Sequence, residues 1–407
     1  MIRILEKQDA AKLIQRKTVR LEEAEAIVAP ILAGVRNRGD RALLEYARKF
    51  DGFEGASVRM KVQGSLTMEM QTAVETAARN IREYAQAQLP KEWFINFPDG
   101  RRLGQIVRPL DAMGGYVPAG RYPLPSTLLM TVIPAQVAGV LKTCVACPNP
   151  SAEIMGIAEW LGVTHLFRMG GAQAIAAFAY GTETVPKVDR IVGPGNIYVA
   201  AAKKLIAGET GIDFVAGPTE IVIIAADGNP AWIAADMLAQ AEHDTDASAI
   251  LLTTSRALAK AVSQEIERQL QTLPTAPVAR PSIEQNGAIV ILDSLDEAVD
   301  ISNQLAPEHL SLHDGSLLKQ IRHAGAVFIG PQSPEAAGDY ASGPNHVLPT
   351  SGAARQRGGL SAADFVKVIA VQELSASALA ALTPAITALA RAEGLEAHAR
   401  SAEVRHE

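Results

Sequence analysis

Short apolar segments alternate with alanine-rich segments of helical periodicity through much of this chain, and no other feature constrains its fold as strongly. The first series begins after Val117. It consists of VLKTCVAC, SAEIMGIAEWLG, VTHLFRM, GGAQAIAAFAYG, VDRIVGPGN and IYVAAAKKLI. A parallel strand, a crossover helix and the next parallel strand give this pattern, so it predicts βαβ units around a parallel sheet.

A second series of the same kind begins near Thr219. It contains EIVIIAA, a helix over Pro230 to Glu242, ASAILLTT, a long helix to about Leu273, GAIVILD, SLDEAVDISNQL and AGAVFIG. Ser294 and Glu297 have the spacing of a helix capping box. The predicted fold class is therefore α/β, with two αβα modules built on incomplete Rossmann-like parallel sheets.

The segments outside the two series have a helical pattern. Apolar residues recur every three or four positions in Leu21 to Asn37 and in Leu66 to Leu89, although Pro30 and Gly34 interrupt the first of these segments. The alanine-rich stretch after Ser361 has no obvious sheet of its own. We therefore expect an N-terminal helical segment over 1–24 and a C-terminal helical tail over 361–407.

Length, charge and composition exclude several classes of protein. A chain of 407 residues suggests roughly two or three domains. The net charge is -6, and no run of basic residues with interleaved aromatics could follow a phosphate backbone, so nucleic acid is not an expected partner. The N-terminus lacks the pattern of a secretion signal, and no apolar run approaches the ~20 residues of a membrane span. We expect a cytoplasmic protein that does not bind membranes.

Cys144 and Cys147 are the only cysteines, and they have C-x-x-C spacing. That spacing can mark a redox pair or half of a zinc site. Here an apolar strand precedes the pair, and the chain has no second pair. We expect both thiols to be buried structural groups.

No G-x-G-x-x-G motif is present, so the ordinary dinucleotide fingerprint is absent. GGAQ at 170–173 and GPGN at 193–196 each lie between a strand and a helix, where backbone N–H groups could face a phosphate. Tight turns in any α/β protein also use glycine. From these motifs alone the cofactor stays open.

Polar residues gather at several points that need an explanation. Gln240 and His243 share a helix face, where they could hold a metal or lie in solvent. Glu308 and His309 are adjacent after a proline and could divide acid and base roles, or lie on a surface loop. Asp339, Asn345 and His346 lie on a loop, and His398 near the C-terminus attracts no attention by itself.

Taken together, these segments resemble the histidinol dehydrogenase family. In chain order they are YVPAGRYPLPST, GGAQAIAAFAYGTETVPKVDRIVGPGNIYV, AGPTE, QAEHDTDA, APEHL, GDYASGPNHVLPT and EGLEAH. They extend over nearly the whole chain. The longest of them are far more specific than a short motif.

The resemblance implies roles for particular residues. Zinc would be held by Gln240, His243, Asp339 and His398, with Glu308 and His309 as the catalytic acid-base pair. The substrate would contact Thr219, Gln240, His243, His309, Asp339, His346, Glu393 and His398. NAD would contact Tyr116, Gln173 and Asn196.

The implied reaction is the last step of histidine biosynthesis, in which L-histidinol is oxidised to L-histidine through L-histidinal with two NAD. Residues 25–108 and 219–360 would form the larger domain with the metal and substrate site, and residues 109–218 the NAD domain. The tail would contact the partner subunit of a homodimer with shared active sites. Because both cysteines are expected to be buried, a covalent thiohemiacetal route is not expected.

The chain departs from the usual family pattern near the substrate. Thr219 replaces a serine, Pro344 replaces a threonine, HDTD replaces HGPD, HAR replaces HKN, and the bulky segment Arg121 to Pro125 replaces small residues. A relative that oxidises another small polar alcohol, such as a sulfonated diol, is therefore an alternative. A catalytically silent binding scaffold is a further alternative, but it would have no need of Glu308 beside His309.

Overall fold

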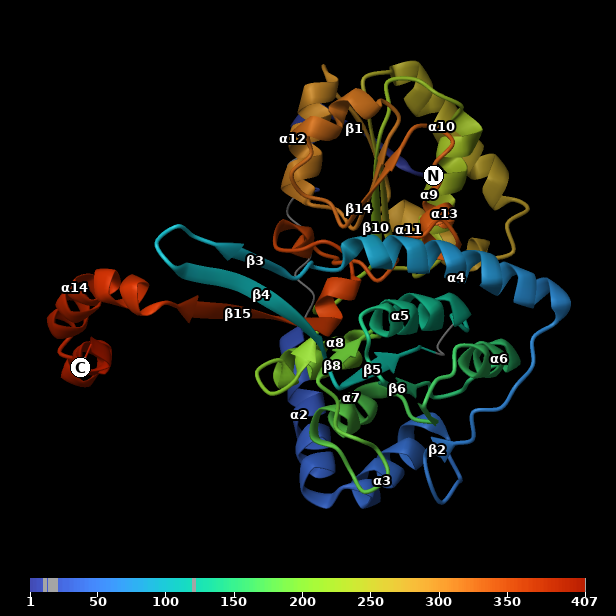
Figure 1. Cartoon of the computed structure of the whole chain (residues 1–407). Coiled ribbons are helices and arrows are strands. Elements are labelled where there is room, and N and C mark those ends of the chain that lie inside the picture. The colour runs from blue at the N-terminus through green and yellow to red at the C-terminus, as the bar shows by residue number, and fades with distance from the viewer. Residues whose placement is uncertain (10–12, 14–20, 119–121, 407) are drawn as a thin grey trace. The chain divides into compact units, whose positions relative to one another are not determined.

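The computed structural model describes residues 1–9, 13, 21–118 and 122–406 (Figure 1). The chain forms two compact units. The first contains residues 1–88 and 111–365, and the second contains residues 89–110 and 366–407. Each unit has its own sheets.

One sheet of the first unit has the strand order β1-β12-β11-β10-β13-β14, and all neighbouring strands are parallel. Its strands are β1 (Arg3–Glu6), β10 (Glu220–Ile224), β11 (Ser248–Thr253), β12 (Ala288–Ile291), β13 (His309–Leu312) and β14 (Ala326–Ile329). Its helices are α9 (Pro230–Ala241), α10 (Arg256–Leu270), α11 (Ala276–Gln285) and α12 (Leu295–Leu305). We call this part the substrate lobe, after the role that the sequence analysis predicts for it.

Both faces of this sheet are covered. Ile221 and Ile223 of β10 belong to the core formed with α9, α10 and α11, whereas Val222 and Ile224 belong to the core formed with α12. Successive side chains point to opposite faces of a strand, so a strand buried on both faces needs an unbroken apolar run. This requirement explains the EIVII sequence of β10.

The second sheet of the first unit has the order β2-β7-β6-β5-β8-β9. Its strands are β2 (Arg59–Met60), β5 (Ala112–Tyr116), β6 (Lys142–Ala146), β7 (His165–Phe167), β8 (Arg190–Val192) and β9 (Gly211–Ile212). Only β2 pairs antiparallel among these described strands. The helices that follow its strands are α5 (Pro125–Val137), α6 (Ala152–Trp160), α7 (Gly171–Tyr180) and α8 (Ile197–Ile206). We call this part the nucleotide lobe, after the role that the sequence analysis predicts for it.

Adjacent glycines of β5 allow helices to approach both faces of this sheet. A Cβ on Gly114 would lie 2.8 Å from Phe178 of α7, and one on Gly115 would lie 3.3 Å from Thr131 of α5. Residues of α2 (Leu21–Arg38) and α3 (Asp40–Asp51) complete the core on the α7 side. The structure therefore groups these two helices with the nucleotide lobe, whereas the sequence analysis assigned 25–108 to the other domain.

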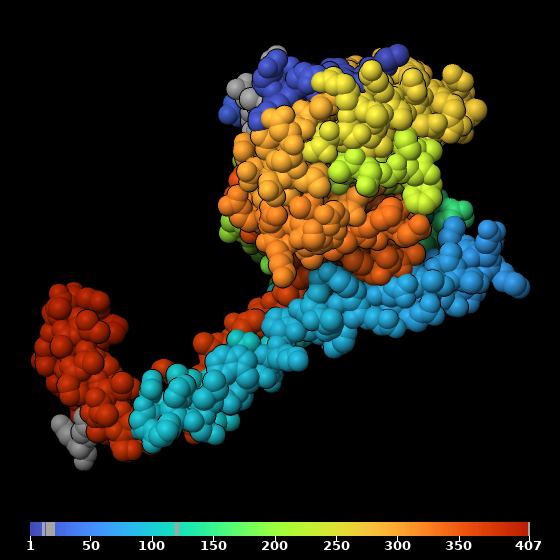
Figure 2. Space-filling view, turned by 90° about the horizontal axis from the view of Figure 1, so that it is seen from above, coloured from blue at the N-terminus to red at the C-terminus, as the bar shows by residue number. Residues whose placement is uncertain are grey.

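The N-terminus also differs from the expectation of a helical segment. Residues Arg3–Glu6 form β1, an edge strand of the substrate lobe, and a short 3-10 helix follows at Lys7–Asp9. Met1 donates to Glu284 and Arg3 donates to the carbonyl of Gly287. Figure 2 shows the first residues, in blue, against the yellow segment that contains α10 and α11. The expected helix over 1–24 otherwise falls largely on residues outside those described.

Helix α4 (Met68–Gln88) matches the segment predicted from its periodicity, and α13 (Glu335–Tyr340) is a short helix after β14. Short 3-10 helices lie at Gly315–Gln320, Ala353–Arg355 and Ala362–Phe365. Among the described residues, none of the helices combines the length and apolarity of a membrane span.

The second unit contains an antiparallel sheet in the order β15-β4-β3, followed by two helices. Its elements are β3 (Trp93–Asn96), β4 (Arg101–Pro109), β15 (Val366–Leu374), α14 (Ala376–Ala392), α15 (Glu396–Glu403) and a 3-10 helix at Val404–His406. The tail ends in helices, as predicted, but the sequence analysis did not predict the strand that precedes them. Strand β15 pairs with β4 along its full length because VKVIAVQEL is rich in the β-branched residues that strands favour.

Candidate active site

The polar residues of the substrate lobe meet at the amino-terminal edge of its sheet. Thr219 directly precedes β10, His309 is the first residue of β13, and His309 is paired in register with Ile221. Helix α9 ends at this same edge, which places Gln240 in its last turn and His243 just beyond it. The sheet register thus brings together residues that are far apart in the sequence.

Glu308 is a buried carboxylic acid held by the start of β10. Its side chain is 6% exposed, and its Oε2 accepts hydrogen bonds from the Thr219 hydroxyl at 2.5 Å and from the Glu220 backbone N–H at 3.0 Å. Burial raises the pKa of Glu308 to about 7, even though nearby His309 and these two donors favour the charged form. A carboxyl group with a pKa near neutrality can accept and return a proton.

His309 is oriented by a backbone carbonyl and keeps one ring nitrogen for chemistry. Its Nδ1 lies 3.2 Å from the carbonyl oxygen of Glu220, while its buried Nε2 has no hydrogen-bond partner among the described residues. Phe328 stacks on the ring at a centroid distance of 6.0 Å. When the ring proton is on Nδ1, this N–H group donates a hydrogen bond to the carbonyl. Nε2 is then free to accept a proton from the substrate.

Carboxylates surround this imidazole. Nδ1 lies 3.6 Å from Glu335 and 3.7 Å from Glu308, and Nε2 lies 3.8 Å from Asp339. Burial alone would lower the pKa of His309, but these carboxylates outweigh burial and raise the pKa to about 10. The cluster therefore attracts positive charge, which a proton or a metal ion can supply.

A set of ligand atoms next to His309 has the spacing of a cation site. Atoms of His243, Glu335 and Asp339 all lie within 4.8 Å of one another. His243 and Asp339 belong to the ligand set implied by the family resemblance. Glu335 does not, and the sequence analysis missed it. Its position four residues before Asp339, after the helix-starting Pro334, was the available signal, because residues at that spacing share a helix face.

Gln240 is fully buried beside Glu335, and its amide can be seated in two ways. In one orientation the amide nitrogen donates to the Thr219 hydroxyl at 2.5 Å, and the amide oxygen faces the carboxylate of Glu335. Rotation by 180° lets the nitrogen donate to Glu335 instead, at 2.9 Å to one oxygen. The second orientation satisfies both ends of the amide, whereas a metal ion held by the amide oxygen beside Glu335 would require the first.

His346 and Asn345 tie this site to the nucleotide lobe. His346 Nδ1 lies 2.8 Å from the carbonyl oxygen of Asp339, and its Nε2 lies 3.3 Å from the hydroxyl of Thr127 in α5. Asn345 is buried and donates to the carbonyl of Met130, also in α5. The loop predicted to carry function therefore lies between the two sheets of the first unit.

Glu393 and His398 belong to the second unit, where both are exposed. Glu393 caps the C-terminus of α14, and His398 lies on α15. The first unit of one chain thus contributes Gln240, His243 and Asp339 to the predicted ligand set, whereas the fourth predicted ligand is carried by the other unit.

The residues predicted to contact NAD lie at the carboxyl-terminal edge of the other sheet. The Tyr116 hydroxyl accepts from the N–H of Gly171, and Gln173 Nε2 donates to Asp51 at 3.0 Å. Asp51 also accepts from the N–H of Gly170. Asp51 was not singled out from the sequence, because an aspartate at the end of a surface helix has no distinguishing pattern.

Asn196 begins α8 and is exposed. Its side-chain oxygen accepts from the N–H groups of Tyr198 and Val199, which is an ordinary helix cap. Its amide nitrogen is not used by this cap. Both glycine turns therefore lie at helix starts, as their sequences indicated.

The two cysteines are free and buried, which confirms the expectation. Burial raises the pKa of the Cys144 thiol to about 12 and that of Cys147 to about 11. Because the thiolate is the nucleophilic form, neither side chain is prepared for covalent catalysis.

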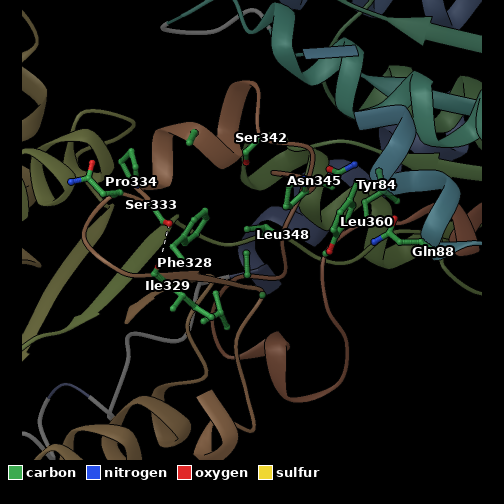
Figure 3. A pocket seen from close by; sticks show the side chains of 17 residues that line it. Tyr84, Gln88, Phe328, Ile329, Ser333, Pro334, Ser342, Asn345, Leu348 and Leu360 are labelled. Atoms are coloured by element: carbon green, nitrogen blue, oxygen red, sulfur yellow. Dashed lines mark hydrogen bonds between the residues drawn. The ribbon is translucent and has the colours of Figure 1, made fainter. Parts of the chain in front are cut away.

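A pocket of about 550 Å³ lies near the acid-imidazole cluster. Figure 3 shows its lining. Its lining includes Phe328 and Ile329 of edge strand β14, Tyr84 and Gln88 of α4, and Leu348. Neither Glu308 nor His309 lines it, so the pocket is a neighbour of the acid-imidazole cluster and not the cluster itself. Phe328 joins the two, since its ring stacks on His309.

The fold and the site define an α/β protein in which a buried acid-imidazole cluster and a set of glycine turns lie on two parallel sheets of one unit. This architecture is typical of enzymes that bind a small substrate and a cofactor at sheet edges. A family model for histidinol dehydrogenase matches residues 14–406, and the chain belongs to this family. The resemblance found in the sequence is confirmed.

Individual relatives agree with this assignment. The chain is 49% identical over 401 residues to histidinol dehydrogenase from Geobacillus kaustophilus, with 95% of each chain covered. It is 47% identical over 404 residues to the Geobacter sulfurreducens enzyme, covering 94% and 93% of the two chains. The crystal structure of histidinol dehydrogenase from Elizabethkingia anophelis superimposes with a TM-score of 0.95 at 36% identity, covering 99% and 98%.

A distant likeness concerns the fold alone. An NAD-dependent aldehyde dehydrogenase from Sinorhizobium meliloti has a TM-score of 0.50 at 13% identity, covering 90% of this chain and 87% of that one. The two-lobed α/β arrangement is therefore shared more widely than the family.

Proposed function

We propose that this chain oxidises L-histidinol to L-histidine through L-histidinal, with two NAD used in succession and with zinc in the substrate site. The observation that carries the proposal is the buried Glu308–His309 pair, whose His309 presents an unpartnered Nε2 to the carboxylate-rich cluster. A silent scaffold would have no reason to bury an imidazole and several carboxylates together, because buried ionisable groups are costly.

In the first half-reaction His309 acts as the base, in its neutral form, which a cation bound among the surrounding carboxylates would favour by offsetting their charge. Its Nε2 accepts the proton of the substrate hydroxyl while the hydride on the same carbon passes to the nicotinamide, giving the aldehyde and NADH. The carbonyl of Glu220 holds the ring through Nδ1, so the accepting nitrogen stays aimed at the substrate.

In the second half-reaction Glu308 activates water. Its carboxylate takes a proton from the water that adds to the aldehyde, and the hydrate anion formed in this way loses a hydride to the second NAD and becomes the carboxylic acid. Thr219 and the N–H of Glu220 fix the orientation of Glu308. With both thiols buried, the aldehyde stays free of a covalent bond to cysteine.

The residues present fit a zinc ion. Gln240, His243 and Asp339 would hold it from the first unit, with His398 as a further ligand, and Glu335 would neutralise its charge from close by. When bound, zinc orients the substrate and polarises its hydroxyl and amine. Thr219, His346 and Glu393 would complete the substrate site, and Tyr116, Gln173 and Asn196 would contact NAD.

We further propose that the enzyme is a cytoplasmic homodimer in which the tail of each chain supplies Glu393 and His398 to the site of its partner. Both side chains are exposed in the second unit of the chain. Because residues that bind a ligand are expected to be covered by the rest of their site, this exposure supports a site that lies on another chain. A two-fold exchange of tails would give two equivalent sites.

Measurement of NADH formation tests the main proposal. With limiting L-histidinol the purified protein should release two NADH per substrate, and a panel of other small alcohols should react far more slowly. Faster turnover of a sulfonated diol would transfer the assignment to the alternative substrate class suggested by Thr219 and Pro344. A yield of one NADH per histidinol would contradict the four-electron reaction.

A further inference from the structure

An ion pair lies buried in the nucleotide lobe, away from the acid-imidazole cluster. The side chains of Lys203 and Asp213 are 2% and 0% exposed, and their charged atoms are in direct contact. Burial of two charges is expensive, and apolar replacements of such pairs are often neutral or stabilising. Stability alone is therefore a weak explanation for this pair.

The pair holds the peptide groups of Gly193 from both sides. Lys203 Nζ donates to the Gly193 carbonyl at 2.9 Å, and the Gly193 N–H donates to Asp213 Oδ2 at 2.8 Å. Asp213 Oδ1 accepts from the N–H of Phe214 at 2.6 Å. Each charged group thus has a backbone hydrogen-bond partner. All of these hydrogen bonds form together only when the Gly193 backbone is in this position.

Asp213 is itself held from outside the turn. Arg357 donates to its backbone carbonyl and lies over the ring of Phe214. Arg357 also forms two hydrogen bonds of 2.9 Å with Asp364. The support therefore extends from Gly193 to Arg357 and Asp364, which follow the loop that contains Asn345 and His346.

Gly193 is a position where small displacements matter. Its φ of +112° is reserved for glycine, and a Cβ there would lie 2.2 Å from the carbonyl oxygen of Tyr116. The turn that starts at Gly193 ends at Asn196, and Tyr116 bonds Gly171 at the other glycine turn. The Gly193 peptide group thus lies between Tyr116 and Asn196, which are two of the residues proposed to contact NAD.

We propose that Lys203 and Asp213 are positioning residues for the cofactor, which fix the Gly193–Asn196 turn in the form that binds NAD. The proposal rests on the proposed use of NAD. The two residues touch the turn and not the cofactor, so their loss should weaken NAD binding without removing a group that takes part in hydride or proton transfer.

Titration calorimetry of NAD into the full-length protein tests this role. Lys203→Met should weaken NAD binding by about tenfold or more, because small misplacements of a binding surface are costly. The matched control is Lys204→Met, because Lys204 is the next residue of α8. It forms an ion pair with Glu25 in which the Lys204 side chain is 48% exposed and the Glu25 side chain is 22% exposed. That exposed pair should be worth little, so NAD affinity should change less than about twofold.

Lys203→Met leaves the Asp213 charge without its partner and can compromise folding. The double variant Lys203→Met/Asp213→Asn removes both charges and keeps an oxygen that can accept from Gly193. If the pair serves only stability, this variant should regain thermal stability and bind NAD like the parent protein. If it positions the turn, stability should return while NAD affinity stays low, with KM for NAD raised and kcat at saturating NAD within about threefold of the parent value.

Equal NAD affinity in the parent protein and in a folded Lys203 variant would overturn the positioning role and leave the proposed function intact. A parent protein that binds no NAD at all would instead overturn the proposed cofactor, and the positioning role with it. The two failures are therefore distinguishable in one experiment.

Discussion

The two six-stranded sheets of the first unit place their candidate site residues at opposite edges. In the nucleotide lobe, Tyr116 is the last residue of β5, and Gly170 and Gly193 follow the carboxyl ends of β7 and β8. In the substrate lobe, Thr219 and His309 lie at the amino ends of β10 and β13, and Gln240 lies where α9 ends. Ligand sites in open α/β sheets ordinarily lie at carboxyl ends, so the second arrangement is the exception.

Helix polarity explains why each edge suits its contents. Helices that follow a strand start at the carboxyl edge and present N–H groups and positive potential, which favour an anionic cofactor. Helices that precede a strand end at the amino edge and present carbonyls and negative potential, which favour cations. The C-terminus of α9 and the nearby carboxylates thus both attract positive charge. The contacts of His346 and Asn345 with α5 connect the two edges.

Removal of metal should have the largest effect, and it should affect only the substrate lobe. Purified protein should contain about one zinc per chain, and prolonged chelation should abolish turnover, because the cation orients the substrate. Calorimetry should show that the chelated protein still binds NAD. Full turnover in protein shown by metal analysis to contain no divalent ion would contradict the proposal that a cation binds at the amino-terminal edge of the substrate-lobe sheet.

Replacement of the base should be nearly as severe. His309→Ala should lower kcat by about 10³-fold, because the hydroxyl proton loses its acceptor. His398→Ala should also be inactive, for loss of a ligand. Co-expression of the two variants tests the shared site, since one site of an exchanged dimer collects both defects and the other receives neither. Verified heterodimers that remain inactive would show that each chain uses its own tail.

Glu308→Gln should separate the half-reactions. We expect aldehyde oxidation to fall by about 10²-fold and alcohol oxidation by much less, because only the former needs an activated water. Since the pKa of Glu308 is about 7, aldehyde oxidation in the parent enzyme should rise as pH increases through 7 and the carboxylate forms. Stopped-flow measurement of each step from pH 6 to pH 8 checks this. Equal losses in both steps would refute the division of labour.

A smaller effect is expected at the carboxyl edge. Asp51→Asn should raise the KM for NAD about threefold with little change in kcat, because it weakens the support of Gln173 and Gly170 without touching the substrate lobe. Steady-state kinetics at saturating histidinol provide the measurement. A lowered kcat at unchanged KM would mean that the two edges are not separable in this way.

The smallest effect belongs to the thiols. With pKa values of about 12 and 11, Cys144 and Cys147 should resist alkylation by iodoacetamide at pH 8 until the protein is unfolded. Cys147→Ala should retain most of its activity in both half-reactions. Loss of aldehyde oxidation alone in this variant would reopen the thiohemiacetal route.

The sequence predicted central strands such as β6, β10 and β11 because they are buried on both faces and read as apolar runs. It missed the short or exposed strands β1, β2 and β9, and also β5 with its two glycines. It did not show which sheet the helices α2 and α3 cover, since an amphipathic helix indicates that one face is buried but not against what. It missed β3, β4 and β15 because their sheet is largely exposed and their sequences mix charged with apolar residues. Tertiary pairing, absent from local pattern, decides such strands.

The candidate site was likewise predicted only in part from the sequence. Motif spacing alone suggested Glu308 with His309 and Gln240 with His243, whereas the roles of Tyr116, Gln173 and Asn196 came only from the family resemblance. Glu335 and Lys203 were missed for physical reasons. A glutamate on a short helix and a lysine in a Lys-Lys pair both look exposed, and only the packing of distant segments buries them.

The hydrogen bonds at the start of α7 bear on how long the cofactor stays. Asp51 and Tyr116 already occupy the N–H groups of Gly170 and Gly171, so a pyrophosphate that arrives there finds those donors committed to the protein. A dinucleotide bound without them should have a short residence time. In the proposed reaction NADH is exchanged for fresh NAD while the aldehyde is retained, so rapid dissociation of NADH would be an advantage and the substrate would need to be bound more tightly than the cofactor.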